Sequence, residues 1–176
     1  MNYADIKQYD VANGPGIRIS LFVSGCTHHC KECFNPETWD FNYGKPFTQE
    51  TIDLIIEYMK PEFISGLTLL GGDPFEIQNQ EPLIPLLKQV KSVYPDKTVW
   101  CFTGYDFERD IVGRMMNEYP FTKELLSYID VMVDGEFILE QKDLSLIFKG
   151  SANQKTIKVK ESLESGTVQL YEFDTE

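Results

Sequence analysis

Apolar positions recur along the chain with two periods, and these periods predict alternating strands and helices. Every second residue of 17–23 is apolar, a pattern typical of a strand that buries one face. Residues 48–59 start at Thr48, a residue type that caps helices, and continue with apolar residues at helical spacing. The same patterns predict strands over 63–70, 97–103 and 129–133, helices over 80–93, 107–118 and 121–128, and further strands over 143–149, 155–160 and 167–173.

The order of these elements indicates the fold class. Strands that alternate with helices are typical of an α/β protein with a mainly parallel sheet. A complete barrel of eight strand–helix units takes about 250 residues, and this chain has 176. We therefore expect a partial, open β/α barrel, with a doubly wound open sheet as the alternative. No repeat or linker interrupts the pattern, so we interpret residues 1–176 as one domain.

Charge and hydropathy argue against two classes of partner. The chain carries 16 Lys and Arg against 28 Asp and Glu, a net charge of −12, and it has no basic run that would hold a phosphate backbone. No stretch reaches the length of about 18 apolar residues that a membrane helix needs. The first ten residues contain two Asp and lack the apolar core of a secretory signal. We expect no nucleic acid or membrane partner, a cytoplasmic location, and no structural disulfides.

Three of the four cysteines lie within eight residues, directly after the strand over 17–23. Cys26, Cys30 and Cys33 have the spacing C-x3-C-x2-C. In α/β folds, the loops at the C-terminal ends of the strands carry the chemistry, and a loop this short lets all three sulfurs face one compact object. Thiolates favour zinc, copper(I) or an iron–sulfur cluster, so we interpret the loop as a metal site.

The number of cysteines leaves the kind of metal site open. Structural zinc takes four protein ligands, and a four-iron cluster normally takes four cysteines. Candidates for a fourth ligand are His28, His29 and Cys101. Both histidines are expected to be solvated loop residues, and Cys101 is expected to pack inside a strand. A structural zinc site and three unconnected thiols remain alternatives to a cluster with one open iron.

Motifs on both sides of the cysteines resemble those of one family. They are Asp10-Val-Ala-Asn13-Gly14-Pro15-Gly16-Ile-Arg18, Cys33-Phe34-Asn35 with Trp39, Gly71-Gly72-Asp73-Pro74, Thr103-Gly104-Tyr105, Asp130-Val131, Asp134-Gly135 and Gly150-Ser151-Ala152-Asn153-Gln154. Together with the cysteine spacing, they resemble the radical S-adenosylmethionine (SAM) enzymes. Within that superfamily they are similar to the branch that activates anaerobic, glycyl-radical ribonucleotide reductases. The matches follow the family's order over nearly the whole chain.

The resemblance implies a cofactor, a substrate and a reaction. Cys26, Cys30 and Cys33 would hold a [4Fe–4S] cluster, and the methionine part of SAM would occupy the fourth iron. Reductive cleavage of SAM would give methionine and a 5′-deoxyadenosyl radical, which would take a hydrogen atom from a glycine of the reductase. The implied partners are the glycyl-radical subunit of an anaerobic ribonucleoside-triphosphate reductase and a reduced flavodoxin-type electron donor. No catalytic residue is assigned beyond the cluster and SAM.

The resemblance also implies where SAM binds. Gly71 and Gly72 would let the backbone approach methionine because they lack side chains, and Asp73 would accept hydrogen bonds from the ammonium group. The superfamily usually has an aromatic residue before the third cysteine, beside adenine, where this chain has Glu32; Phe34 is expected to supply that surface instead. The expected cofactor contacts are therefore Glu32, Cys33, Phe34, Gly71, Gly72 and Asp73.

Two rival functions and one open residue remain. The chain would alternatively activate another glycyl-radical enzyme, such as pyruvate formate-lyase, or act as a non-catalytic zinc module or small electron carrier. Arg18 points away from the apolar face of its strand, where it would meet a carboxylate or face solvent.

Overall fold

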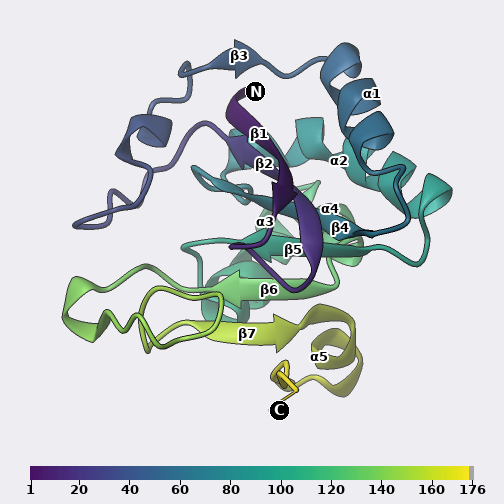
Figure 1. Ribbon diagram of the computed structural model, residues 1–176. Helices are drawn as coiled ribbons and strands as arrows, with labels where there is room; N and C mark the ends of the chain where they lie inside the picture. The colour runs from purple at the N-terminus through teal and green to yellow at the C-terminus, as the bar shows by residue number, and fades with distance from the viewer. Residues whose placement is uncertain (175–176) are drawn as a thin grey trace.

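A seven-stranded sheet forms the centre of the molecule in the computed structural model, which describes residues 1–174 (Figure 1). The strands are β1 (Asn2–Asp10), β2 (Ile17–Val23), β3 (Lys45–Pro46), β4 (Ile64–Gly71), β5 (Thr98–Phe102), β6 (Val131–Asp134) and β7 (Lys155–Lys158). Their order across the sheet is β3-β1-β2-β4-β5-β6-β7. The middle strands β2, β4, β5 and β6 pair in parallel, whereas β3, β1 and β7 join the sheet through antiparallel pairs.

Helices connect the parallel strands, and one further helix follows the last strand of the sheet. They are α1 (Gln49–Tyr58), α2 (Ile77–Val93), the π-helix η2 (Phe107–Met115), α3 (Met116–Glu118), α4 (Thr122–Ser127) and α5 (Val159–Ser165), with short 3-10 turns at η1 (Pro36–Trp39) and η3 (Leu139–Gln141). The start of α1 follows from its sequence, because Thr48 and Thr51 satisfy each other's backbone in a capping box. None of the helices in the described part of the chain has the length and hydropathy that a bilayer crossing requires.

The helices after the parallel strands pack on one face of the sheet. The strands β2, β4, β5 and β6 succeed one another without a reversal of direction across the sheet. Right-handed crossovers therefore deliver each connecting helix to the same side. Buried residues of α1, α2, η2 and α4 accordingly share one apolar cluster with alternate residues of these strands. The doubly wound alternative is wrong, since that fold requires a reversal of the strand order across the sheet. The sheet is open and does not close into a complete barrel.

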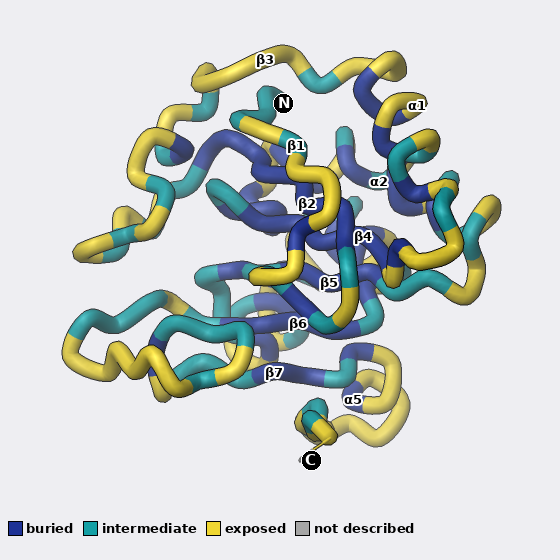
Figure 2. Tube along the Cα trace, in the orientation of Figure 1, coloured by how far each residue is buried: buried dark blue, intermediate teal, exposed yellow. Residues whose placement is uncertain are grey.

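The other face of the sheet carries a cavity in place of helices. Phe22, Leu70 and Phe102, near the C-terminal ends of β2, β4 and β5, line this cavity. Two residues before Phe102 on β5, and on the same face of the sheet, Trp100 packs with aromatic side chains of the C-terminal segment. Figure 2 shows the middle strands as buried, while the loops beyond their ends are largely exposed. The three clustered cysteines therefore lie on the exposed loops beyond the C-terminal ends of the parallel strands, beside this cavity.

The prediction of a strand over 143–149 is wrong. These residues belong to the loop between β6 and β7 (residues 135–154, called the β6–β7 loop below), and within the loop only a single bridge joins Lys142 to Ser151. The Asp143 carboxylate accepts hydrogen bonds from the backbone and hydroxyl of Ser145, which favours a turn over an extended strand. The alternating apolar residues that suggested a strand face the cavity instead.

Other boundaries differ by smaller amounts. The sequence pattern missed β1, because most of this strand is exposed or half-buried and lacks a continuous apolar face. The strand predicted over 155–160 ends at Lys158, and α5 begins at the next residue. The strand predicted over 167–173 reduces to one bridge between Leu170 and Ile157. The predicted helix over 107–118 is confirmed, although its first nine residues form a π-helix.

Both expectations for Arg18 are wrong. Its side chain is 0% exposed and meets no carboxylate within the described residues. The guanidinium instead donates hydrogen bonds to the hydroxyls of Thr68 and Thr98 and to the carbonyl oxygens of Leu67, Thr98 and Pro15. Burial lowers the pKa of Arg18 to about 10. Arg18 therefore joins β2, β4 and β5 by hydrogen bonds inside the protein.

Candidate metal centre

The three clustered cysteines lie on one loop that leaves β2 and returns to η1. Backbone N–H groups of Gly25 and Cys26 donate to the carbonyl oxygens of Thr38 and Trp39, at 2.7 and 3.2 Å. A tight turn closes the second half of the loop, since the Cys33 N–H donates to the Cys30 carbonyl at 3.1 Å. The loop is therefore held at both ends, and each of its three thiols is partly accessible.

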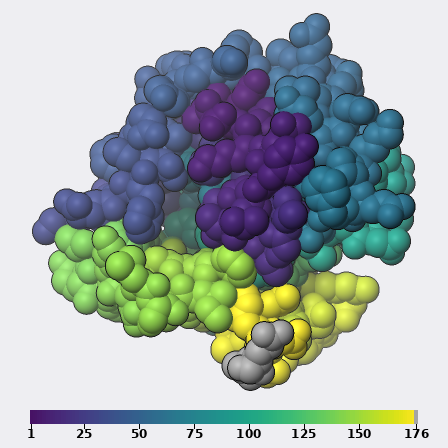
Figure 3. Space-filling model, in the orientation of Figure 1, coloured from purple at the N-terminus to yellow at the C-terminus, as the bar shows by residue number. Residues whose placement is uncertain are grey.

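All three thiols line a cavity of about 530 Å³ at the C-terminal ends of the parallel strands. Gly71, Gly72 and Asp73 line the same cavity, and the β6–β7 loop forms its opposite wall. Figure 3 shows the surface hollowed between the cysteine segment and the β6–β7 loop. A volume of about 300–1,000 Å³ is typical of sites for small ligands and cofactors.

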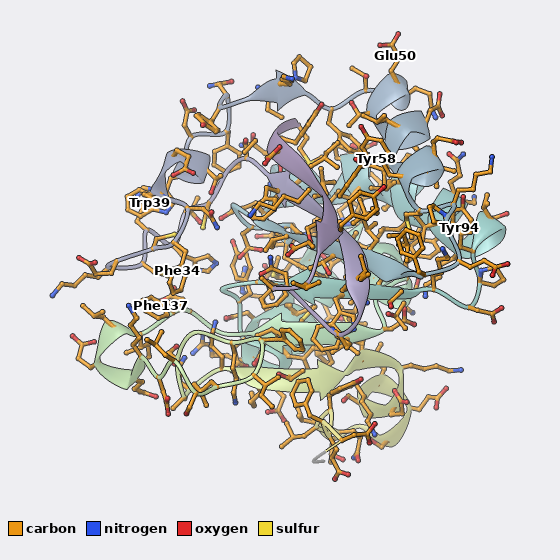
Figure 4. All side chains as sticks on the ribbon, viewed as in Figure 1. Phe34, Trp39, Glu50, Tyr58, Tyr94 and Phe137 are labelled. Atoms are coloured by element: carbon orange, nitrogen blue, oxygen red, sulfur yellow. The ribbon has the colours of Figure 1, made fainter. Side chains whose placement is uncertain are left out.

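Aromatic residues from the two walls meet beside the cavity. Phe34 of the cysteine loop and Phe137 of the β6–β7 loop have ring centroids 5.2 Å apart (Figure 4). Phe34 lines the cavity. Glu32, in contrast, is exposed and is not among the described residues that line it. Of the two positions that flank Cys33, the structure therefore brings Phe34, and not Glu32, to the cavity.

The structure gives Gly71 and Gly72 a role that the sequence did not indicate. A Cβ atom on Gly72 would stand 2.5 Å from the carbonyl oxygen of Gly25, and one on Gly71 would stand 2.7 Å from that of Val23. The space that a side chain would take is thus filled by the backbone at the end of β2 and the start of the cysteine loop. The two glycines allow the cysteine loop to cross closely over the end of β4.

We expect Gly72→Ala to displace the cysteine loop. Because the added methyl group meets backbone, it should lower the free energy of unfolding by about 1–3 kcal/mol and lower iron loading as well. Chemical denaturation and iron analysis measure the two effects. Gly166→Ala is the control for the added methyl group: no atom lies within 4 Å of the new Cβ, although the φ of 74° at Gly166, unlike that at Gly72, is itself unfavourable for alanine. Normal iron loading in Gly72→Ala would contradict this account.

Asp73 connects three parts of the site through one buried carboxylate. The side chain is 1% exposed and accepts hydrogen bonds from the backbone N–H groups of Phe75 and Gly104, at 2.9 and 2.8 Å. It also accepts one from the Thr103 hydroxyl at 2.8 Å and contacts Nε2 of His28 at 3.0 Å. A ligand ammonium group would share this carboxylate with four protein donors. Its evident effect is to hold the cysteine loop to the ends of β4 and β5.

The two neighbouring histidines have different environments. His28 was expected to be solvated, and this is wrong: its side chain is 10% exposed and lies between Asp73 and Glu136. Burial disfavours the charged imidazolium, but the contacts with both carboxylates outweigh this effect and raise the pKa of His28 to about 9. His29 is exposed, as expected, and its ring stacks on Trp39 with centroids 4.6 Å apart.

Two of the three thiols, those of Cys26 and Cys30, are poor nucleophiles in the absence of a metal. Burial, together with the nearby Asp73 charge, raises the pKa of Cys26 to about 12, and burial also raises the pKa of Cys30. Protonated thiols do not attack electrophiles, so nucleophilic catalysis by Cys26 is disfavoured. A bound cation favours the thiolate and releases the proton. The electrostatics therefore suit a metal ligand better than a reactive cysteine.

The three sulfurs are not gathered as closely as around a single zinc ion. Tetrahedral zinc with Zn–S bonds of about 2.3 Å brings its sulfurs to within about 4 Å of one another. Among the described residues, ligand atoms that gather within 4.8 Å belong to Cys26, His28 and Asp73, without Cys30 and Cys33. That group is explained by the hydrogen bond between His28 and Asp73. The three sulfurs are thus spread more widely than one ion requires.

The expected candidates for a fourth ligand are engaged elsewhere. Both ring nitrogens of His28 contact carboxylates, and His29 stacks on Trp39. Cys101 is fully buried in the apolar cluster of β5, as expected. A three-cysteine loop beside a cavity of small-molecule size therefore fits a cluster that leaves one iron open to a small ligand.

The Gly150–Gln154 motif has a structural role that its sequence did not reveal. The Gln154 side-chain amide donates to the Gly135 carbonyl at 2.9 Å, and its oxygen accepts from the Gly150 N–H at 2.8 Å. The Asn153 amide donates to the Glu136 carbonyl at 2.8 Å. These bonds join the two ends of the β6–β7 loop, so the motif shapes one wall of the cavity.

The fold and the site together define an α/β protein with an iron–sulfur centre. Residues 12–157 match the family model of the 4Fe-4S single cluster domain, which supports a cluster on Cys26, Cys30 and Cys33. The chain belongs to the family of anaerobic ribonucleoside-triphosphate reductase-activating proteins. It is 46% identical over 157 residues to the member from Vibrio cholerae, which covers 88% of this chain and 96% of that one. It is 39% identical over 156 residues to the member from Escherichia coli K12, with the same coverage, and 40% identical over 157 residues to that of Enterobacteria phage T4, covering 88% and 92%.

Proposed function

We propose that this chain activates an anaerobic ribonucleoside-triphosphate reductase by generating a glycyl radical on it. The similar proteins of Vibrio cholerae and Escherichia coli are named activating proteins of that reductase. The observation that carries the proposal is the single loop that presents Cys26, Cys30 and Cys33 to one cavity, while the candidate fourth ligands are engaged elsewhere. This arrangement leaves room for SAM as the remaining ligand.

The proposed cofactor is one [4Fe–4S] cluster on the three cysteines. When bound and reduced, it supplies the electron that cleaves SAM to methionine and a 5′-deoxyadenosyl radical, which then takes a hydrogen atom from a glycine of the reductase. Oxidoreductase activity of the radical SAM type follows from this proposal. We likewise propose that the open sheet is a partial barrel of that superfamily, that the electron donor is a reduced flavodoxin-type protein, and that the protein works in the reducing cytoplasm.

The residues of the cavity would bind and shield SAM. We propose Phe34 as the surface beside adenine, and Gly71, Gly72 and Asp73 as the wall beside methionine, because all four line the cavity together with the cysteines. Apolar side chains from β2, β4 and β5 form the cavity floor. Such walls limit the access of other reactants to a reactive radical.

The outer rim of the cavity is suited to a protein substrate. Leu144 of the β6–β7 loop lines the cavity and is 89% exposed, and Phe34 on the opposite side is also exposed. Large apolar side chains exposed at a cavity rim are typical of interaction sites. We propose that the glycine-bearing loop of the reductase contacts Leu144 and Phe34 as it approaches SAM, and that the docked loop closes the cavity.

Anaerobic incubation with the reductase, SAM and a reductant tests the function. Electron paramagnetic resonance should detect a glycyl radical that depends on this chain, on SAM and on the reductase glycine. A colourless protein that binds zinc after anaerobic iron reconstitution would contradict the proposal. Radical formation on pyruvate formate-lyase, but not on the ribonucleotide reductase, would instead favour the rival partner.

We expect Leu144→Glu to separate SAM cleavage from radical transfer. An exposed carboxylate at the rim should disfavour docking of an apolar loop, so the glycyl radical yield should fall about tenfold. SAM cleavage in the absence of reductase should change less than about twofold, because the substitution leaves the cysteine loop intact. Leu163→Glu, at an exposed leucine of α5, is the matched control and should leave both activities unchanged. Equal losses in both activities would contradict the docking role of Leu144.

A further inference from the structure

His28 contacts two segments that are distant from it in the sequence. Its Nε2 lies 3.0 Å from Oδ2 of Asp73, and its Nδ1 lies 2.8 Å from Oε1 of Glu136. The ring of Tyr105 packs edge-on against the imidazole with centroids 4.5 Å apart. Because both nitrogens are engaged, the ring cannot turn without breaking both contacts.

The two carboxylates belong to opposite walls of the cavity. Asp73 directly follows Gly71 and Gly72, and its carboxylate also bonds to residues after β5. Glu136 is the second residue of the β6–β7 loop, which forms the other wall. His28 lies between Cys26 and Cys30, so its side chain connects the cysteine loop to both walls at once.

The neighbouring protein is shaped around this side chain. A Cβ atom on Gly104 would stand 2.6 Å from the His28 ring, so a glycine after β5 leaves the space that the ring occupies. The next residue, His29, lies on the same loop but makes no comparable pair of contacts with carboxylates of the described residues. It is exposed and stacks on Trp39.

We propose that His28 is a positioning residue for SAM. It holds the cysteine loop to both Asp73 and Glu136, and thereby fixes the position of the three sulfurs relative to Gly71 and Gly72. This inference rests on the proposed function of the cavity as the SAM site. Since His28 supplies no ligand atom to the cluster in this account, its loss should impair SAM binding more than cluster binding. A residue needed only for folding would impair both together.

Four variants of the reconstituted full chain, compared with the unchanged protein, test this inference. His28→Phe keeps an aromatic ring at this position and removes both nitrogens, whereas the amide of His28→Gln is able to keep one of the two contacts with a carboxylate. Glu136→Ala removes the contact to Nδ1 without changing the cysteine loop, and Glu136 is 56% exposed, so the fold should tolerate it. His29→Asn is the matched control, because asparagine tolerates the positive φ of 51° at this position.

The measurements are iron content, the dissociation constant of SAM, and the change that SAM causes in the electron paramagnetic resonance spectrum of the reduced cluster. We expect near-normal iron in all four variants. SAM binding should weaken at least about tenfold in His28→Phe, the lower end of the range typical of residues that support metal ligands. The loss should be smaller in His28→Gln and in Glu136→Ala, which each remove one of the two contacts. The SAM-dependent spectral change should shrink in the same order, and His29→Asn should match the unchanged protein.

The outcomes separate this inference from the proposed function. If the unchanged protein binds a cluster and SAM, and His28→Phe and Glu136→Ala do so equally well, the positioning role is wrong and the function stands. If His28→Phe loses iron while Glu136→Ala binds SAM normally, His28 serves only the loop fold, which also overturns the inference. If the unchanged protein itself shows no cluster or no response to SAM, the proposed function fails.

Discussion

The variant Cys30→Ala is expected to remain folded and to lose both iron and SAM cleavage. Cys30 lies on a surface loop, is only partly buried, and does not belong to either apolar cluster, so the fold should not depend on it. Two cysteines cannot replace the three cysteine ligands of a cluster that leaves one iron open to a small ligand. Iron content after reconstitution and the rate of SAM cleavage should therefore fall at least about 100-fold, beyond the range for residues that only support ligands.

A second cysteine provides the control for this result. Cys101 is fully buried in β5 and packs in the main apolar cluster. Cys101→Ala should therefore lower the free energy of unfolding by about 1 kcal/mol, through lost packing, and leave iron content and SAM cleavage unchanged. The visible spectrum, iron analysis and chemical denaturation separate the two variants. A Cys30→Ala protein that still cleaves SAM would remove the basis of the proposed function.

The largest effect on stability is expected from Arg18→Ala. Arg18 is among the largest fully buried side chains, and five hydrogen bonds join it to β2, β4, β5 and the turn before β2. Alanine would leave a cavity as well as buried oxygen atoms without these donors. We expect the free energy of unfolding to fall by about 3–5 kcal/mol, a large part of the about 5–15 kcal/mol of a typical domain.

Two further variants separate the causes of this loss. Arg18→Met retains the volume of the side-chain stem and should recover part of the stability, which isolates the contribution of the hydrogen bonds. Arg114→Ala removes an exposed arginine whose guanidinium lies 3.3 Å from Glu118, and it should change the stability by less than about 0.5 kcal/mol. Urea denaturation of the metal-free chains gives all three values. A loss of less than about 1 kcal/mol in Arg18→Ala would show that the buried guanidinium is not important for the fold.

The elements that sequence predicted well are those with a continuous apolar pattern. The strand over 17–23 matches β2, and the helix over 48–59 contains α1, because each buries one recurrent face in the main cluster. The strand predicted over 143–149 failed because its alternating apolar residues line the cavity wall instead of a sheet. Periodicity reports which side of a segment is apolar, and it does not report whether a partner strand lies beside it.

Arg18 and His28 show the same limit at the level of single residues. Arg18 was expected to meet a carboxylate or face solvent, and His28 was expected to be solvated. Each is instead held inside the protein by residues far along the chain. Arg18 bonds to Thr98, and His28 bonds to Glu136, 108 positions away. Such contacts depend on which strands become neighbours in the sheet, and no local spacing encodes them.

The order of residues by itself determined the chemical possibilities of this protein. It places three thiols after one strand, close enough in the chain to share one metal centre, and two glycines at the end of a later strand. Only the tertiary structure decided how these parts meet. It filled the side-chain space of Gly71 and Gly72 with the backbone of β2 and the cysteine loop, buried Asp73 and His28 between the walls, and used the Gly150–Gln154 motif to shape the cavity. The physical reason is that ligand type and loop length are local properties of the chain, whereas burial and hydrogen-bond partners arise only when distant segments pack together.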